Sequence, residues 1–202
     1  MSISISDVRA DIMARGIMPA NKFNVNMTVP DYLTGRYDSR TISTRCESAS
    51  LPGVSMTGAE GMRLGYGPLE MTPSSLIFQD IPLVFMLDAG GEVYEFFYNW
   101  MNCIVNYNSS RGANAKEGPV SSASTYEVGY KSKFTSQVEI SSQGNKQNDA
   151  SGGYQNSITT TLYSAYPKSI SDLDLNWESN DTYVKLQVVL GFKDYKTTFY
   201  NG

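Results

Sequence analysis

The sequence feature that most constrains the fold is an alternation of apolar and polar residues with a period of two, which recurs along most of the chain. Its cleanest example lies near the C-terminus, where Val184, Leu186, Val188, Leu190 and Phe192 alternate with Tyr183, Lys185 and Gln187. Similar alternation occurs at 23–29, 134–140 and 172–177. Successive side chains of a strand point to opposite faces, so each segment predicts a strand with one buried and one polar face. The sequence therefore predicts a mainly β protein.

Other segments predict strands from weaker patterns. The apolar run Pro82–Leu87 predicts a short strand that is buried on both faces, and Arg45–Ser48, Thr125–Tyr130 and Gln155–Tyr163 are further candidates. After the first of these comes Leu51-Pro52-Gly53, in the stretch RCESASLPGVSM. Proline fixes φ and glycine tolerates positive φ, so this tripeptide is expected to end a strand and to direct the next segment of the chain.

One helix is strongly predicted, in the segment EVYEFFYNWMNCI, at about Glu92–Val105. Its apolar residues recur at the spacing of one helical face: Val93, Phe96, Phe97, Trp100, Met101 and Ile104. Such a stripe is expected to pack on the sheet as plain core, since burying each large side chain contributes about 1.5–3 kcal/mol. A weaker helix is predicted at Ser6–Ala14, with Ser6 as the N-cap.

The organisation is that of one domain, 1–202, interrupted by long polar loops. These loops are predicted at 54–67, 108–124 and 141–153, the last as an extended hairpin tip between two strands. Loops of this length are uncommon in compact domains unless they carry function. The expected fold class is a β-sandwich or barrel with one flanking amphipathic helix.

Composition narrows the function classes. The chain has no histidine, which removes the commonest general base and the commonest metal ligand. It has 16 basic and 20 acidic residues, a net charge of −4 and no dense basic face of the kind that binds nucleic acid. Cys46 and Cys103 lack zinc-ligand spacing and are expected to be free thiols in a reducing compartment. No apolar run has the length of a membrane-spanning helix, and the N-terminus carries charges where a signal peptide would be apolar.

Few residues converge on a catalytic pattern. Asp172 and Asp174 share one face of a predicted strand, where they form either a general acid/base pair or, the favoured interpretation, part of a solvated face. The glycine-rich stretch 61–67 lacks the Lys-Ser/Thr ending of a phosphate-binding loop. We therefore expect a protein that is not an enzyme and that needs no cofactor and no metal.

The polar strand faces and the edges of such a sheet point to assembly. A single sheet leaves edge strands unpaired, and these edges pair readily with other chains. Pairing around a closed ring of identical copies removes the edges, and the polar faces then line a water-filled bore.

The order of several segments resembles a known family. These segments are RGIMPANKFNVNM, TRCESASLPG, GYGPLEM, SSLIFQDIPLVFMLD, EFFYNWMNCI, YEVGYKSKFTSQVEI and LYSAYPKSISDLDLNWESNDTYVKLQVVLGFKDY. Together they resemble the tail tube proteins of contractile-tailed bacteriophages of the T-even type, from about Arg15 to Tyr195. The chain departs from that pattern in enlarged loops around Ala113 and Gln147 and in the tract Pro30–Arg40.

The resemblance implies a structural virion protein of the phage tail, assembled in the host cytoplasm. Homo-hexameric rings with a continuous inner β-barrel would stack into a tube inside the tail sheath, between baseplate and tail-terminator proteins. The tape-measure protein and genomic DNA would pass through the lumen without specific binding. Six chains at −4 would give a ring about −24, a field that repels a polyanion from the wall.

The resemblance also assigns roles to particular residues. Leu51, Pro52, Gly53 and Val54 are the candidates for launching an inter-ring loop, and Gln137, Glu139, Asp172 and Asp174 are the candidates for the lumen wall. Three alternatives stay open: a tube-initiator or adaptor ring at the baseplate, a carbohydrate-binding β-sandwich, and a carboxylate hydrolase.

Overall fold

The computed structural model describes residues 4–15, 17–59, 65–67, 72–107, 128–147, 154–177 and 182–200. Its elements are, in chain order, α1 (Ile5–Arg15), β1 (Phe23–Met27), η1 (Asp31–Leu33), α2 (Ser39–Thr44), β2 (Cys46–Ala49), β3 (Val54–Ala59), β4 (Thr72–Phe78), β5 (Ile81–Met86), α3 (Glu92–Ile104), α4 (Lys131–Phe134), β6 (Ser136–Gln147), β7 (Tyr154–Ile170), β8 (Lys185–Gly191) and β9 (Asp194–Phe199). The predicted mainly β fold is confirmed, and so is the predicted helix at about Glu92–Val105.

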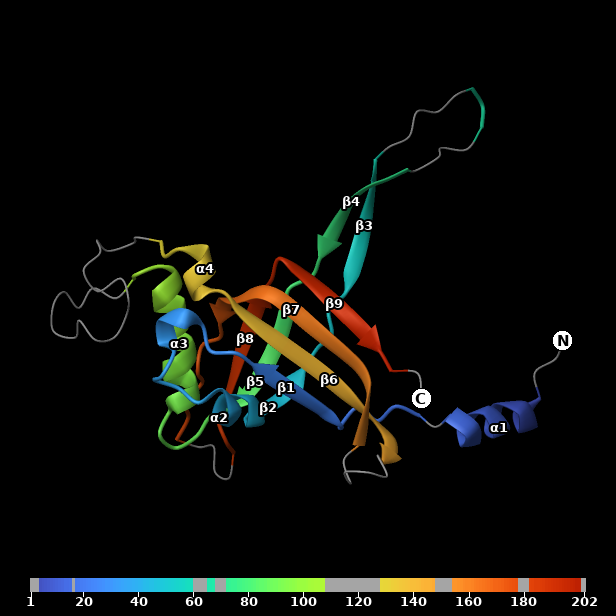
Figure 1. Cartoon of the computed structure of the whole chain (residues 1–202), viewed down its shortest axis with the longest axis horizontal. Coiled ribbons are helices and arrows are strands. Elements are labelled where there is room, and N and C mark those ends of the chain that lie inside the picture. Colours follow the sequence, from blue (N-terminus) through green and yellow to red (C-terminus); the bar gives the residue numbers. More distant parts are fainter. Residues whose placement is uncertain are drawn as a thin grey trace.

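The body consists of two antiparallel sheets that share the long strand β7 (Figure 1). The segment 158–163 of β7 lies between β6 and β9, which gives sheet A the order β1-β6-β7-β9. The segment 166–170 pairs with β8, which gives sheet B the order β7-β8-β5-β2. Ser164, between these two segments, has a φ of 51°. This left-handed backbone, uncommon for a residue other than glycine, lies where the strand leaves one sheet for the other.

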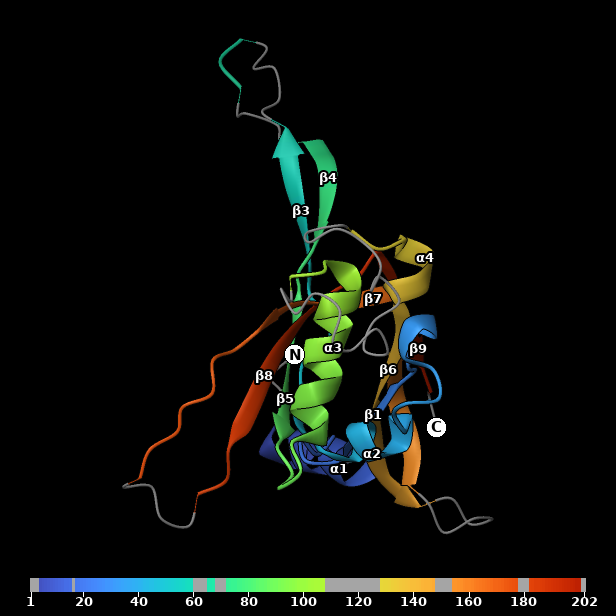
Figure 2. The ribbon, with the colours of Figure 1, turned by 90° about the vertical axis from the view of Figure 1, so that its left-hand side faces the viewer.

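The core lies between the inner faces of the two sheets and is closed by α3 (Figure 2). Sheet A contributes Val25, Met27, Val138, Ile140 and Leu162, and sheet B contributes Ile81, Leu83, Phe85, Leu186, Val188 and Leu190. The apolar stripe of α3 completes the cluster, with Phe96, Phe97 and Trp100 fully buried. The stripe therefore functions as core packing, as its helical spacing predicted.

Two strand predictions are wrong, one in part and one entirely. The run Pro82–Leu87 buries only one face, because Ile81, Leu83 and Phe85 point into the core while the opposite face of β5 is exposed or half-buried. Segment 172–177 is not a strand at all, and its Leu175 and Trp177 are 81% and 101% exposed. Alternation alone does not make a strand; a neighbouring strand must supply the hydrogen bonds, and none in the described ranges pairs with this segment.

The first helix begins earlier than predicted, and its cap is Ser4 rather than Ser6. The hydroxyl of Ser4 accepts a hydrogen bond from the N–H of Ser6, and its carbonyl accepts one from Val8. In return, the N–H of Ser4 donates to Oδ2 of Asp7 at 3.1 Å. This reciprocal arrangement is a capping box, which fixes the start of α1.

The predicted loops are shorter than expected. Residues 54–59 and 72–78 form the hairpin β3–β4 instead of belonging to a loop at 54–67, and β6 continues to Gln147, well into the predicted loop 141–153. The loop 108–124 lies outside the described residues. Of the strand candidate Thr125–Tyr130, the described part makes only an isolated bridge, between Val128 and Val105.

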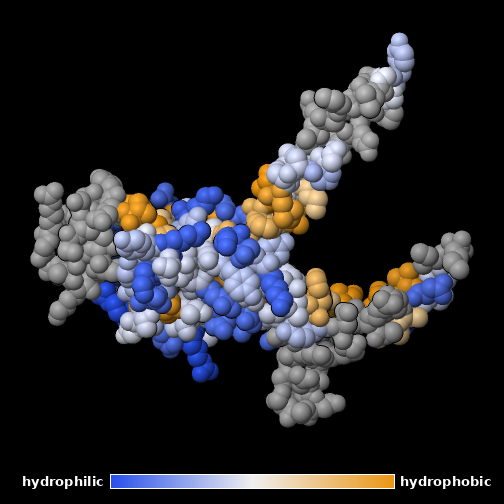
Figure 3. All heavy atoms as spheres, turned by 45° about the horizontal axis from the view of Figure 1, so that its top comes forward, coloured by the Kyte–Doolittle hydropathy of each residue, from blue (hydrophilic) through white to orange (hydrophobic). Residues whose placement is uncertain are grey.

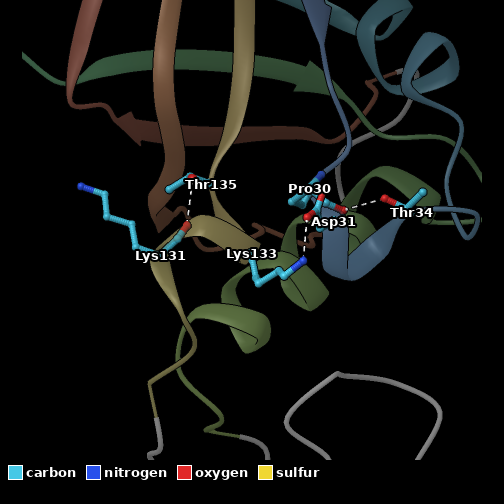
Figure 4. A network of polar contacts seen from close by, with 6 residues as sticks. All are labelled: Pro30, Asp31, Thr34, Lys131, Lys133 and Thr135. Atoms are coloured by element: carbon cyan, nitrogen blue, oxygen red, sulfur yellow. Dashed lines mark hydrogen bonds and ion pairs between the residues drawn. The ribbon is translucent and has the colours of Figure 1, made fainter.

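Two short helical segments lie side by side beyond the end of β1 and the start of β6 (Figure 4). Lys133 of α4 forms an ion pair of 3.1 Å with Asp31 of η1. The hydroxyl of Ser136, at the start of β6, donates to the carbonyl of Thr28. The ion pair is exposed and contributes little free energy, so the buried strands rather than this contact hold the end of the sheet in place.

Candidate assembly surfaces

The strand β9 leaves one side of its backbone unpaired. Tyr200, just after β9, donates its N–H to the carbonyl of Ser157 in β7 at 3.0 Å. Along an antiparallel strand, every second residue directs its N–H and C=O groups to the same neighbouring strand. The N–H and C=O groups of Tyr195, Thr197 and Phe199 therefore face away from β7. Within the described ranges, no strand pairs with that side of β9.

The strand β1 forms the other edge of sheet A. The N–H of Thr28, just after this strand, donates to the carbonyl of Gln137 in β6. By the same alternation, the backbone groups of Phe23, Val25 and Met27 face away from β6. The N–H of Met27 is bound by the hydroxyl of Ser43 in α2, at 3.1 Å. Among the described strands, none lies along the rest of this edge.

These two edges have opposite strand directions. Sheet A has four strands, and each pair of neighbours is antiparallel, so β1 and β9 run antiparallel to each other. An open edge with unpaired amides is a template for another chain. Because the two edges differ, a pairing of β1 with β9 of another copy is head-to-tail, which generates either a ring or a filament.

The face of sheet A that points away from the core is polar. One row across its strands consists of Asn26, Glu139, Thr161 and Lys196, and the next consists of Asn24, Ser141, Thr159 and Thr198. Glu139 is a predicted lumen residue, and Gln137 is exposed near the start of the same strand. The sequence pattern thus placed these two residues on one strand of a polar face.

Asp172 and Asp174 are not brought together with Gln137 and Glu139. They lie on the irregular segment after β7, which extends away from sheet B on the opposite side of the molecule from β6 (Figure 2). Both line a cleft whose other walls include Trp177 and Tyr183. The hydrolase alternative, which depends on these two carboxylates, would place its site in this cleft.

An ion pair links the edge strand of sheet B to the base of this segment. Lys185 Nζ lies 2.6 Å from Glu47 Oε1, and the hydroxyl of Tyr183 donates to the same oxygen at 3.1 Å. These hydrogen bonds, chiefly that from Lys185, hold the pKa of the Glu47 carboxyl below its usual range. The same contact raises the pKa of Lys185.

The hairpin β3–β4 projects from the body (Figure 1), and several of its apolar side chains are exposed to solvent. Register places Val54, Met56 and Leu76 on one face, and they are 50%, 68% and 50% exposed. Figure 3 shows that apolar side chains gather on the described part of the hairpin nearest the body. An unpartnered patch of this kind on a protruding ribbon is typical of an interaction site.

The root of the hairpin is fixed to the body by contacts between aromatic rings. Phe78, the last residue of β4, packs edge-on against Tyr195, with 5.3 Å between the ring centroids. Its ring centroid lies 5.9 Å from that of Phe192. The carboxylate of Asp80 forms an ion pair with Lys168, which raises the pKa of that lysine. The hairpin therefore has an anchored base and an exposed shaft.

The tripeptide Leu51-Pro52-Gly53 connects β2 to this hairpin. Gly53 accepts a hydrogen bond from the N–H of Gln79, which closes the two chains at the neck. A Cβ atom on Gly53 would lie 3.0 Å from Oε1 of Gln79, the far end of a flexible side chain that can shift to accommodate it. As predicted, the strand stops before this tripeptide, but the segment after the tripeptide is a strand and not a loop.

The sequence did not single out the open-edge residues Tyr195, Thr197 and Phe199. The run 194–199 is rich in Thr and aromatic residues, which favour strands, and this was the available signal. Its place at an edge depends on the order of strands in space, which the local pattern does not contain.

The described ranges hold neither a metal-binding cluster nor a membrane-spanning helix. In those ranges, no group of three or more His, Cys, Asp or Glu side chains is arranged to hold a metal ion. Likewise, none of the helices described there is long and apolar enough to span a membrane. Both cysteines are free, as predicted.

Comparison with known structures identifies the fold. The chain superposes on a protein of the anti-feeding prophage baseplate, from a 6-fold symmetrised cryo-EM structure, with a TM-score of 0.58 at 12% identity, covering 91% of this chain and 96% of that one. It also matches a chain of the anti-feeding prophage tube-terminating cap, with a TM-score of 0.58 at 16% identity, over 99% and 97% of the two chains. A chain of the PVC sheath-tube complex, from an extracellular contractile injection system, matches with a TM-score of 0.55 at 19% identity, covering 98% of this chain and 100% of that one. The chain thus shares its fold with chains of these baseplate, cap and sheath-tube assemblies.

The family assignment is more specific. The model of the phage tail tube protein family matches residues 18–198, and the chain belongs to that family. No curated protein sequence matches the chain. The resemblance drawn from the sequence segments is therefore confirmed.

Proposed function

We propose that this chain is the subunit of the inner tube of a contractile phage tail, and that it forms hexameric rings by pairing strand edges. The observation that carries the proposal is the pair of open, antiparallel edges, β1 and β9, on a single four-stranded sheet. Membership of the tail tube family supports a structural role.

In the proposed ring, β1 of each copy lies beside β9 of the next. Since β1 and β9 run antiparallel, the antiparallel alternation of sheet A continues across each boundary between copies. Six copies then close a barrel of about 24 strands, and no edge of sheet A is left for uncontrolled pairing. Each added cross-strand pair contributes roughly 0.2–1 kcal/mol, so several pairs at each boundary stabilise the ring.

The polar face of sheet A is the proposed lumen wall. Glu139 and Asp194 are acidic and Lys196 is basic in the register rows of this face, which leaves it weakly acidic. DNA and a tape-measure protein would pass such a wall without a strong binding site. The predicted lumen role of Gln137 and Glu139 fits this arrangement, because both lie on this face. Asp172 and Asp174 lie outside sheet A, so their lumen role stays a prediction.

The hairpin is the proposed contact between rings. Its anchored root, with Leu51, Pro52 and Gly53 at the neck, precedes a hairpin that projects from the body (Figure 1), and Val54 and Met56 of this hairpin are exposed. Burying these side chains and Leu76 against the next ring would contribute on the order of 1 kcal/mol each. The sheath would surround the outside of the tube, and baseplate and terminator proteins would contact its two ends.

An initiator or adaptor ring at the baseplate is an alternative within the same class. The fold does not separate the two roles, because similar folds occur in a baseplate and in a cap structure. Electron microscopy of the purified protein separates them. Long tubes of stacked six-fold rings support the bulk tube role, whereas one or two rings that never elongate indicate the initiator. A protein that stays monomeric under all assembly conditions, with baseplate seeds included, would contradict both.

A further inference from the structure

The helix α1 lies off the body, beyond the start of β1 (Figure 1), and its apolar side chains are exposed to solvent. Ile5, Val8 and Ile12 recur at the spacing of one helical face and are 88%, 48% and 44% exposed, and Met13 beside them is 72% exposed. A helix of 11 residues is marginal by itself in water. A well-capped helix with an uncovered apolar stripe therefore needs a partner surface.

A matching apolar surface lies at one end of sheet A. Register places Phe23, Ser142, Ile158 and Phe199 in a single row across its four strands. Phe199 is 65% exposed and Ile158 is half-buried, although their positions in β9 and β7 continue the core-facing rows. Sheet B does not extend far enough to cover this end, because its pairing with β7 starts only at Tyr166.

Within one copy, Phe199 lies at the far edge of sheet A from β1, the strand that follows α1. Three strand spacings of about 4.8 Å separate β1 from β9, so the two edges lie roughly 14 Å apart within one copy. In the proposed ring the neighbour's β9 lies one spacing from β1. Antiparallel pairing also sets the start of β1 beside the end of β9, where Phe199 lies.

We propose that α1 packs its Ile5–Val8–Ile12 stripe on the Phe199 end of sheet A in the adjacent copy of the same ring. This inference rests on the proposed ring, since it takes the neighbour's position from β1–β9 pairing. The helix then acts as a clasp between copies: it covers an apolar surface that one copy leaves open, at the boundary where two sheets join.

Disulfide cross-linking between two separately purified variants tests the contact. Val8→Cys and Phe199→Cys are mixed before ring assembly, so that a cross-link between them can only join different chains. Lys193→Cys, at the opposite end of β9, replaces Phe199→Cys in the control mixture, and each variant alone and the parent protein give the background. A dimer on a non-reducing gel from the first mixture alone is the expected result.

Hydrogen exchange of residues 5–15 gives a second readout that does not depend on cysteines. Exchange is expected to slow by about tenfold or more when monomers form rings, because packing suppresses the opening of a marginal helix. Val8→Asp is expected to abolish this protection in rings. Ala10→Asp adds the same charge on the opposite side of the helix and is expected to preserve it.

The outcomes separate this inference from the ring itself. Rings seen by microscopy without a Val8–Phe199 cross-link, or with equal yield in the Lys193 control, overturn the clasp and leave the ring proposal intact. Cross-links that form in stacked tubes but not in isolated single rings also overturn it, because the contact would then be with another ring. Absence of rings overturns the proposed function and the clasp together.

Discussion

The indole N–H of Trp100 donates a hydrogen bond of 2.6 Å to the backbone carbonyl of Phe134. Trp100 is fully buried at the centre of the α3 stripe, and Phe134 lies two residues before β6 begins. The bond therefore ties the helix that closes the sandwich to the entry of a central strand of sheet A.

Trp100→Phe is expected to lower the free energy of unfolding of the monomer by about 1–3 kcal/mol. The substitution leaves the buried carbonyl of Phe134 without its donor, and such an unsatisfied group costs about that much. Urea denaturation measures the change. Trp177→Phe, at a position that is 101% exposed, is the control and is expected to change stability by less than about 0.5 kcal/mol.

Thr197→Pro is expected to abolish ring formation while leaving a folded monomer. Proline removes an N–H that faces the open edge of β9, so the ladder to β7 keeps its donors. Thr197→Val keeps the N–H but loses the hydroxyl contact with Thr160, 3.0 Å away, and is expected to form rings with a monomer destabilised by about 1 kcal/mol. Circular dichroism checks the fold, and analytical ultracentrifugation checks assembly. Equal assembly of both variants would place the ring contact elsewhere.

Met56→Asp is expected to give rings that do not stack into tubes. A carboxylate in place of an apolar side chain must be desolvated if the hairpin shaft is buried between rings. Ser55→Asp places the same charge on the opposite face of β3 and is expected to interfere less. Tube length in electron micrographs is the measurement, and tubes of normal length from Met56→Asp would exclude this face of the hairpin from the ring contact.

Glu47→Gln is expected to make the stability of the monomer depend less on pH in the acid range. The contact with Lys185 lowers the pKa of Glu47 in the folded state, so its stabilisation is fully present above the unfolded value near 4.3 and is lost as pH falls through the folded value. The denaturation midpoint of the parent protein should therefore fall between about pH 5 and 3 more steeply than that of the variant. Lys185→Met removes the partner of Glu47 and should also make the denaturation midpoint fall less steeply over this pH range. The same steepness in both variants as in the parent protein would contradict the proposed role of this ion pair in the pH dependence of stability.

The sequence predicted the elements whose local pattern and tertiary role agree. The alternation at 184–192 and the stripe around Trp100 each point one face into a core, and both occur in the structure as β8 and α3. The end of the strand before Pro52-Gly53 was also predicted, because the restricted φ of proline acts locally, although Gly53 itself does not adopt a positive φ.

The sequence could not predict features that depend on partners in space. The segment from Asp172 to Trp177 alternates like a strand but has no neighbour among the described strands, whereas the glycine-containing β3, predicted as a loop, becomes a strand because β4 pairs with it. The passage of β7 from one sheet to the other at Ser164 has no local signal either. For the same reason, the open edge at Thr197 became visible only once the strand order was known.

The most direct test of ring formation by edge pairing is a cryo-EM map of the assembled protein at a resolution that shows the backbone. The account predicts a closed six-fold ring in which the N–H and C=O groups of Tyr195, Thr197 and Phe199 pair with β1 of the next copy, with Glu139 facing the bore. Rings in which the β9 edge remains in solvent, or contacts that join copies through sheet B, would contradict it.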